Sequence, residues 1–227
     1  MERPFVYMNM AMTVDGKITS ARREYANFTS DLDRTFMDRL RAEADAILIG
    51  AGTLRSDDPP LHVRNPEMRE YRRSLGKPDH LPRIVVTAGG DLDGSLSFFE
   101  YAGGRPPLVA TVESLDRDRL ERLEAHAEVV QVGTTSVDLT KLLALLESRG
   151  IHRLLVEGGG EMNWELLHAG LVDEIYVTVA PVLLGGRDAP TLLEGDGWPM
   201  DLHRRLNLLE MRREGDEIYC RYGVQTL

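Results

Sequence analysis

Two periodicities of apolar residues alternate along this 227-residue chain, and they predict strands separated by helices. Short apolar runs of strand length recur at 5–10, 46–49, 83–87, 107–111, 128–132, 154–156 and 174–179. Helical spacing follows at 31–44, 115–125, 139–148 and 162–167. The last apolar runs, 206–211 and 217–224, flank a polar turn and predict an antiparallel hairpin. The pattern therefore predicts a single α/β domain over 1–227 with a mixed sheet.

Polar residues that precede two of the helical segments fit helix N-caps. Ser30 or Thr29 can cap the first helix, and Asp138 can cap the helix that ends before Gly150. The first helix is expected to bury one apolar face, made of Leu32, Phe36, Met37 and Leu40.

Residues 65–82 interrupt this order. The stretch is polar and contains three prolines, so it is predicted to be a surface loop. Its basic side chains are expected to be solvated: Arg69, Arg72, Arg73 and Lys77.

Composition narrows the function classes. The chain has 27 Lys and Arg against 37 Asp and Glu, a formal net charge of −10, which argues against a broad surface for nucleic acid or anionic membranes. Its one cysteine, Cys220, rules out an internal disulfide, and the six histidines have no metal-ligand spacing, so no metal is expected. The N-terminus has no signal-peptide pattern and no apolar run reaches membrane-spanning length. A cytoplasmic protein is the expectation.

The first candidate site follows the apolar run 154–156. Glu157 is followed by Gly158, Gly159 and Gly160, and helical spacing begins at once. Glycines let the backbone approach a ligand closely, and a helix N-terminus attracts an anion, so the segment suits a phosphate or pyrophosphate. Glu161 in the first helical turn leaves a second interpretation, a tight turn in which this glutamate caps its own helix.

This segment is not a dinucleotide fingerprint of the Rossmann type. Asn163 stands where the third glycine belongs, and no acidic residue ends a strand about 20 residues later.

The second candidate site covers 50–64, where a buried strand again ends in glycines. Thr53 can donate to a phosphate, Asp57 can bind a polar substrate or transfer a proton, and Arg64 has the forked donors that suit a phosphate. The alternative is an Asp-Pro turn with Arg64 as a solvated charge. A third segment, 13–17, reads more simply as an Asp-Gly turn than as a ligand loop.

Several of these segments occur together in one known family. The stretches 9–18, 41–45, 50–59, 157–164, 170–174 and 180–186 stand in the matching order, so residues 4–224 closely resemble the pyrimidine reductases of riboflavin biosynthesis. These occur as the reductase half of a bifunctional deaminase–reductase and as free-standing enzymes, and the free-standing type is the nearer match.

The resemblance implies a dihydrofolate-reductase-like fold: a mixed, mostly parallel sheet flanked by helices, with a C-terminal antiparallel hairpin. It implies NADPH as hydride donor, a homodimer, and reduction of the ribose of a ribosylaminopyrimidine 5′-phosphate to a ribityl chain. The implied cofactor contacts are Met12, Thr53, Asp57, Glu157, Gly158, Gly159, Gly160 and Glu161. The implied substrate contacts are Asn27, Arg41, Asp57 and Arg64, with the arginines at the ribose phosphate. Asp57 is also the candidate proton donor.

Two departures from the family pattern bear on the cofactor. The run at 87–90 lacks the acidic and hydroxyl pair that often follows this strand, so NADH stays an alternative donor. Glu161 adds negative charge beside the glycines. The motifs fit the 2,5-diamino pyrimidine phosphate and its deaminated form equally, so both stay open as substrates. Two further functions also stay open: the same fold and cofactor acting on another heterocycle, or a non-catalytic nucleotide-binding partner of a separate deaminase.

Overall fold

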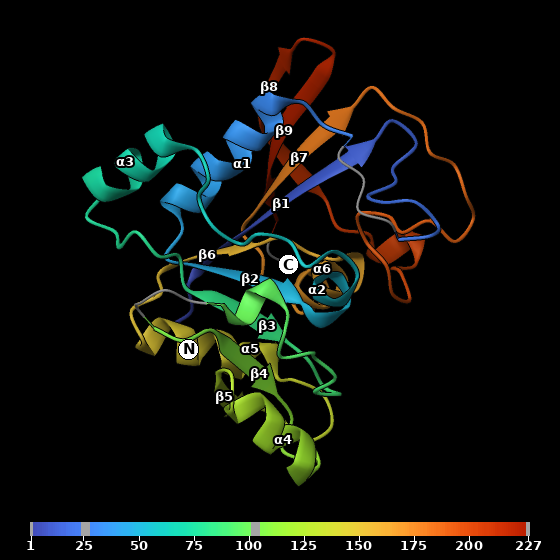
Figure 1. Cartoon of the computed structure of the whole chain (residues 1–227). Helices are drawn as coiled ribbons and strands as arrows, with labels where there is room; N and C mark the ends of the chain where they lie inside the picture. The colour runs from blue at the N-terminus through green and yellow to red at the C-terminus, as the bar shows by residue number, and fades with distance from the viewer. Residues whose placement is uncertain (1, 24–27, 101–104, 226–227) are drawn as a thin grey trace.

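The computed structural model describes residues 2–23, 28–100 and 105–225, which form a nine-stranded sheet with helices on both faces (Figure 1). The strand order is β5-β4-β3-β2-β6-β1-β7-β9-β8. The strands are β1 (Phe5–Thr13), β2 (Ala46–Gly50), β3 (Arg83–Val86), β4 (Leu108–Thr111), β5 (Glu128–Gln131), β6 (Arg153–Val156), β7 (Glu174–Ala180), β8 (Leu206–Glu214) and β9 (Glu217–Val224). The helices are α1 (Asp31–Glu43), α2 (Ala51–Asp57), α3 (Pro66–Ser74), α4 (Arg117–Glu124), α5 (Leu139–Ser148) and α6 (Gly160–His168).

The pairing of the strands confirms the predicted mixed sheet. Every pair from β5 across to β7 is parallel, whereas β7–β9 and β9–β8 are antiparallel. The β8–β9 hairpin turns at residues 215–216, inside the predicted turn. Because the parallel strands point the same way, β1, β2, β3 and β6 deliver their carboxyl ends to one edge of the sheet, where open α/β sheets bind ligands.

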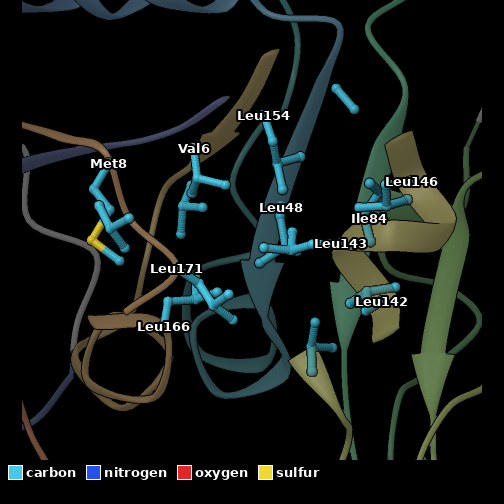
Figure 2. Close-up of a cluster of buried hydrophobic side chains, with 14 of the residues drawn as sticks. Val6, Met8, Leu48, Ile84, Leu142, Leu143, Leu146, Leu154, Leu166 and Leu171 are labelled. Carbon is cyan, nitrogen blue, oxygen red and sulfur yellow. The ribbon is translucent and has the colours of Figure 1, made fainter. Parts of the chain in front are cut away.

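Alternating apolar residues divide the core into two clusters, one on each face of the sheet. In β2, Leu48 packs into one cluster and Ile47 into the other, since successive side chains of a strand point to opposite faces. The first cluster is closed by leucines of α5 and α6, as Figure 2 shows. The second is closed by residues of α1, α2 and α4, including Leu40, Leu54 and Leu123.

The predicted caps are confirmed, but one face was assigned wrongly. Ser30 caps α1 and Asp138 caps α5, each accepting a hydrogen bond from a backbone N–H of the first turn. Leu32 is 57% exposed. The inward face of α1 carries Asp38 and Arg41 beside Leu40, so it is partly charged, and Leu32 lies off this face.

The predicted surface loop at 65–82 is wrong. Asn65 caps α3 and Pro66 occupies its first turn, a sequence signal of a helix start. The Arg72 side chain, expected in solvent, is fully buried. Its Nη1 lies 2.6–3.2 Å from the carbonyls of Arg41, Ala42 and Ala44 at the C-terminal end of α1, where carbonyls lack the N–H partner that the next helical turn would supply. A guanidinium there also complements the negative end of the helix dipole.

Candidate active site

A cleft of about 1030 Å³ lies at the carboxyl ends of the parallel strands. Residues 9–11 of β1 line it, together with 50–53 and 55–57 at the end of β2 and in α2, 86–89 at the end of β3 and 159–162 after β6. This volume lies at the top of the range usual for one small-molecule site. The cleft therefore has room for two ligands side by side.

The two glycine-containing candidate sites meet in this cleft. The Gly50 N–H donates to the Gly158 carbonyl at 2.8 Å, and a Cβ on Gly159 would lie 2.6 Å from Thr53 Oγ1. Figure 1 shows the resulting arrangement, with α2 and α6 side by side. Two segments about 100 residues apart, 50–53 and 158–160, thus form one surface of the cleft, here called the glycine floor. It carries the Thr53 hydroxyl and the N-terminus of α6.

The protein's own packing accounts for two of the three consecutive glycines. Gly158 has φ +80°, and a Cβ there would lie 2.9 Å from Met10 Sδ. A Cβ on Gly160 would lie 2.8 Å from the Thr191 carbonyl. Gly159 is the N-cap of α6 and faces the cleft. Gly159 and Gly160 both line the cleft and Gly158 does not, so the close backbone approach to a ligand involves two glycines of the triplet instead of three.

Glu161 lies in the first turn of α6 and lines the cleft. No hydrogen bond from a backbone N–H to its carboxylate is found within 2–23, 28–100 and 105–225, so the self-capping interpretation has no support in the structure.

Arg41 does not line the cleft; it pairs with Glu157, which does. Its side chain is 2% exposed, and it forms a two-pronged pair with Glu157, Nε to Oε1 and Nη2 to Oε2, both at 2.7 Å. Its Nη1 donates to the carbonyls of Pro60 and His62 at 2.8 and 2.9 Å. The side chain expected at a ribose phosphate therefore joins β6 to the segment before Arg64.

Asp38 extends this network to Arg64, and sequence reasoning missed it. Asp38 Oδ2 accepts hydrogen bonds from the backbone N–H groups of Arg64 and Asn65 at 3.2 and 2.8 Å. Its Oδ1 lies 3.9 Å from Arg41 Nη1 and 4.0 Å from Arg64 Nε. The Arg64 side chain is 34% exposed and lines the cleft. Buried charges thus fix the backbone of Arg64, while its guanidinium can reach a ligand.

Asp57 and Asp58 have different roles, although the Asp-Pro interpretation placed both of them in a turn. Asp58 has φ +37° and accepts hydrogen bonds from Ser97 N and Oγ, both at 2.9 Å. Asp57 ends α2 and lines the cleft, and its buried Oδ1 has no hydrogen-bond partner among the described residues. Orphaned buried acceptors are rare, so Asp57 is suited to accept a hydrogen bond from a ligand.

One further predicted contact lies outside the cleft. Met12 packs against the first core cluster and does not line the cleft, whereas Met10 does. The reason is that β1 leaves β6 after Met8, so the cleft opens beside the next residues and Met12 lies beyond it. Asn27 falls outside the described residues.

The segment 13–17 is a turn, as preferred from the sequence. Gly16 has φ +78°, and the Asp15 carboxylate accepts hydrogen bonds from Thr13 Oγ1, Leu184 N and Gly185 N at 2.6–3.2 Å. These donors lower the pKa of Asp15 to about 2. Asp15 therefore ties two loops together instead of binding in the cleft.

Acidic side chains outnumber basic ones among the described residues that line the cleft. Its cationic lining residues are Arg23, Arg34, Arg55 and Arg64. Within the described ranges, no cluster of His, Cys, Asp and Glu could hold a metal ion, and no helix has the length and apolar character to cross a membrane. Cys220 is a half-buried residue of β9.

Comparison with known proteins identifies the chain's relatives. Residues 4–219 match the family described as the RibD C-terminal domain. The chain is 34% identical, over 97% of its length and 99% of the relative's, to an Archaeoglobus fulgidus protein named 2,5-diamino-6-ribosylamino-4(3H)-pyrimidinone 5′-phosphate reductase.

Two solved structures support the fold. A pyrimidine reductase-like protein from Corynebacterium diphtheriae superposes with a TM-score of 0.83 at 22% identity, covering 98% of this chain and 92% of the other. Dihydrofolate reductase from Enterococcus faecalis superposes with a TM-score of 0.50 at 12% identity, covering 98% and 97%. The dihydrofolate-reductase-like fold is therefore confirmed.

Proposed function

The chain belongs to the RibD C-terminal domain family, and on this premise we propose that it reduces the ribose of 2,5-diamino-6-ribosylamino-4(3H)-pyrimidinone 5′-phosphate to the ribityl form. One observation carries the proposal. The glycine floor, with its helix N-terminus, and the anchored Arg64 segment border the same cleft. Two anion-binding features in one cleft suit a nucleotide cofactor beside a phosphorylated substrate.

We propose NADPH as the cofactor, held over the glycine floor. The residues present fit such a group: Gly159 and Gly160 at the start of α6, the Thr53 hydroxyl, and the orphaned acceptor of Asp57. Glu161 lines the same part of the cleft, and the negative charge of its carboxylate repels a pyrophosphate bound there. Met10 replaces Met12 as the apolar contact near the nicotinamide. When bound, the cofactor supplies a hydride to the anomeric carbon of the sugar.

We propose that Arg64 binds the 5′-phosphate of the substrate. Its guanidinium can form two charge-assisted hydrogen bonds to a phosphate, and its backbone is already held by Asp38. Arg41 acts one layer behind, by positioning Glu157 and the 60–62 segment.

The test of this function is the oxidation of NADPH, followed by absorbance, with the diamino pyrimidine phosphate and with its deaminated form. We expect turnover with the diamino compound and slower turnover with NADH. Binding of NADPH without turnover of either compound would favour the non-catalytic partner. Turnover of another heterocycle, and of neither pyrimidine phosphate, would favour a reductase with the same fold and cofactor but a different substrate.

Gly159→Ala is expected to weaken NADPH binding by about tenfold or more, a cost of about 1.4 kcal/mol. The new methyl group would lie 2.6 Å from Thr53 Oγ1, so the threonine must rotate away from its proposed phosphate contact. The measurement is the dissociation constant from fluorescence titration.

Thr53→Ala provides the control for that variant. In this background the Gly159→Ala change meets no hydroxyl, so its additional cost is expected to shrink. An undiminished cost would show that the methyl group excludes the cofactor directly.

We also propose that the chain forms a homodimer through the hairpin of β8 and β9. One face of this hairpin exposes Leu208, Met211 and Ile218, which are 55%, 65% and 41% exposed. An uncovered apolar sheet face is typical of a protein interface. Sedimentation analysis of the wild type and of Met211→Glu tests the proposal, with the variant expected to be monomeric.

A further inference from the structure

One acidic residue of the cleft wall has no role in the reductase proposed above. Asp33 lies in the first turn of α1, is 8% exposed and lines the cleft. Its backbone N–H donates to Ser30 Oγ at 3.3 Å, so the helix cap holds it in place. No ion pair of Asp33 is found within the described part of the chain, which is unusual for a buried carboxyl.

A second carboxyl, Glu217, lies behind Asp33 and is stabilised as the anion. Ser30 N and Ser30 Oγ donate to Oε1 and Oε2 at 2.7 and 2.6 Å, and the Tyr219 hydroxyl donates to Oε2 at 2.6 Å. Burial opposes the charge of Glu217, but these hydrogen bonds outweigh it and lower its pKa.

The environment of Asp33 shifts its pKa in the opposite direction, upward. Burial is the largest effect on the pKa of Asp33 and raises it. The Thr178 and Thr29 hydroxyls act against burial, and the negative charge of Glu217 is the smallest of the four effects and raises the pKa further. Two neighbouring carboxyls whose pKa values are pushed apart mark an acid and its charged partner. Asp33, the member whose pKa is raised, lines the cleft.

Asp33 also lies at the correct end of the cleft for the sugar. Thr178, beside Asp33, pairs in register with Ala11, a cleft residue of β1. Five residues further along α1, a rise of about 7.5 Å, Asp38 holds the Arg64 segment. A ribose phosphate bound at Arg64 therefore has its ring within the stretch of cleft that Asp33 borders.

We propose that Asp33 is the proton donor that opens the ribose ring, an inference that rests on the reductase function proposed above. The lone pair of the glycosidic nitrogen forms a C1′=N bond while the C1′–O4′ bond breaks, and O4′ takes the proton of the Asp33 carboxyl. C1′ then receives the hydride that a bound reduced nicotinamide supplies. Solvent returns a proton to Asp33, so each turnover consumes one hydride and one proton.

Asp57, the proton donor favoured by the sequence, is better suited to binding. Its orphaned Oδ1 needs a hydrogen-bond donor from the ligand, whereas a proton donor must itself provide the hydrogen.

The decisive variant is Asp33→Asn, which keeps the shape of the side chain and removes the transferable proton. We expect kcat to fall by about 100-fold or more, with the NADPH dissociation constant unchanged. Asp31→Asn is the matched control, because Asp31 lies in the same helical turn with its side chain 88% exposed and is expected to keep wild-type kcat. The infrared C=O band of the protonated carboxyl should disappear in Asp33→Asn only.

A second variant leaves Asp33 intact. Wild-type kcat is expected to fall as pH rises through the pKa of Asp33, because the donor loses its proton. Glu217→Gln removes the charge that raises this pKa, so the basic limb of the profile should move to lower pH. The limb should be absent in Asp33→Asn.

Three results would overturn the proposal: wild-type kcat in Asp33→Asn, a raised KM with unchanged kcat, which would make Asp33 a binding contact only, or an unmoved limb in Glu217→Gln. If Asp33→Asn fails to fold, the Glu217→Gln profile decides alone. Absence of turnover in the wild type, with NADPH bound, would instead refute the reductase function.

Discussion

Arg41→Ala is expected to lower the free energy of unfolding by about 3–5 kcal/mol, the usual cost of removing one partner of a buried ion pair. The substitution leaves Glu157, whose side chain is 11% exposed, without its counter-charge. It also removes the Arg41 donor from the His62 carbonyl, whereas the Pro60 carbonyl still accepts the His62 N–H at 3.0 Å. Urea denaturation followed by circular dichroism measures the loss, with an unchanged m-value expected.

Arg39→Ala is the matched control for this stability prediction. Arg39 lies on the same helix, is 58% exposed, and pairs with Glu43 four residues away. Such a surface pair is worth less than about 1 kcal/mol. Adding Glu157→Gln to Arg41→Ala should restore part of the stability, because the unpaired charge is removed. Equal losses for Arg39→Ala and Arg41→Ala would contradict the prediction.

Arg64→Ala is expected to raise KM for the phosphorylated substrate by about tenfold to a hundredfold, the equivalent of the 1.5–3 kcal/mol of a charged hydrogen bond. We expect little change in kcat, since the side chain is proposed to bind the phosphate equally before and during the reaction. Steady-state kinetics at saturating NADPH measures the effect. Stability should change little, because the guanidinium is partly exposed and its backbone contacts to Asp38 remain.

Two comparisons make the Arg64 prediction specific. Arg69→Ala removes an exposed arginine of α3 outside the cleft and should leave KM unchanged. The dephosphorylated substrate should bind the wild type and Arg64→Ala alike. A KM that rises equally for both substrates would show that Arg64 shapes the cleft without contacting the phosphate.

Most of the fold was predictable from the sequence, because the signals that specify helices and strands are local. The apolar run predicted at 46–49 forms β2, in which Leu48 and Ile47 lie in opposite core clusters because successive side chains of a strand alternate. Caps such as Ser30 and Asp138 act within one helical turn. The Asn65-Pro66 signal was equally local, and three prolines in a polar stretch concealed it.

The candidate site was predictable in part. The glycines at 158–160 were recognised as a candidate site because a backbone without side chains can approach a ligand closely. In the structure, two of these glycines are also required by packing, against Met10 and against the Thr191 carbonyl. Arg64 lines the cleft as expected. Its anchor, Asp38, had no sequence signal, because an aspartate on a charged helix looks the same whether it is buried or exposed.

The sequence by itself determined the order of the elements except α2 and α3, and it singled out the two glycine-containing segments that meet in the cleft. Only the tertiary structure decided what each charge does. Arg41 pairs with a residue 116 positions away, and Ser30 with one 187 positions away. Periodicity reports on neighbours within a few residues, whereas burial and partner choice set the state of a charge. For that reason Arg41, Arg72 and Asp33 received their roles from the fold.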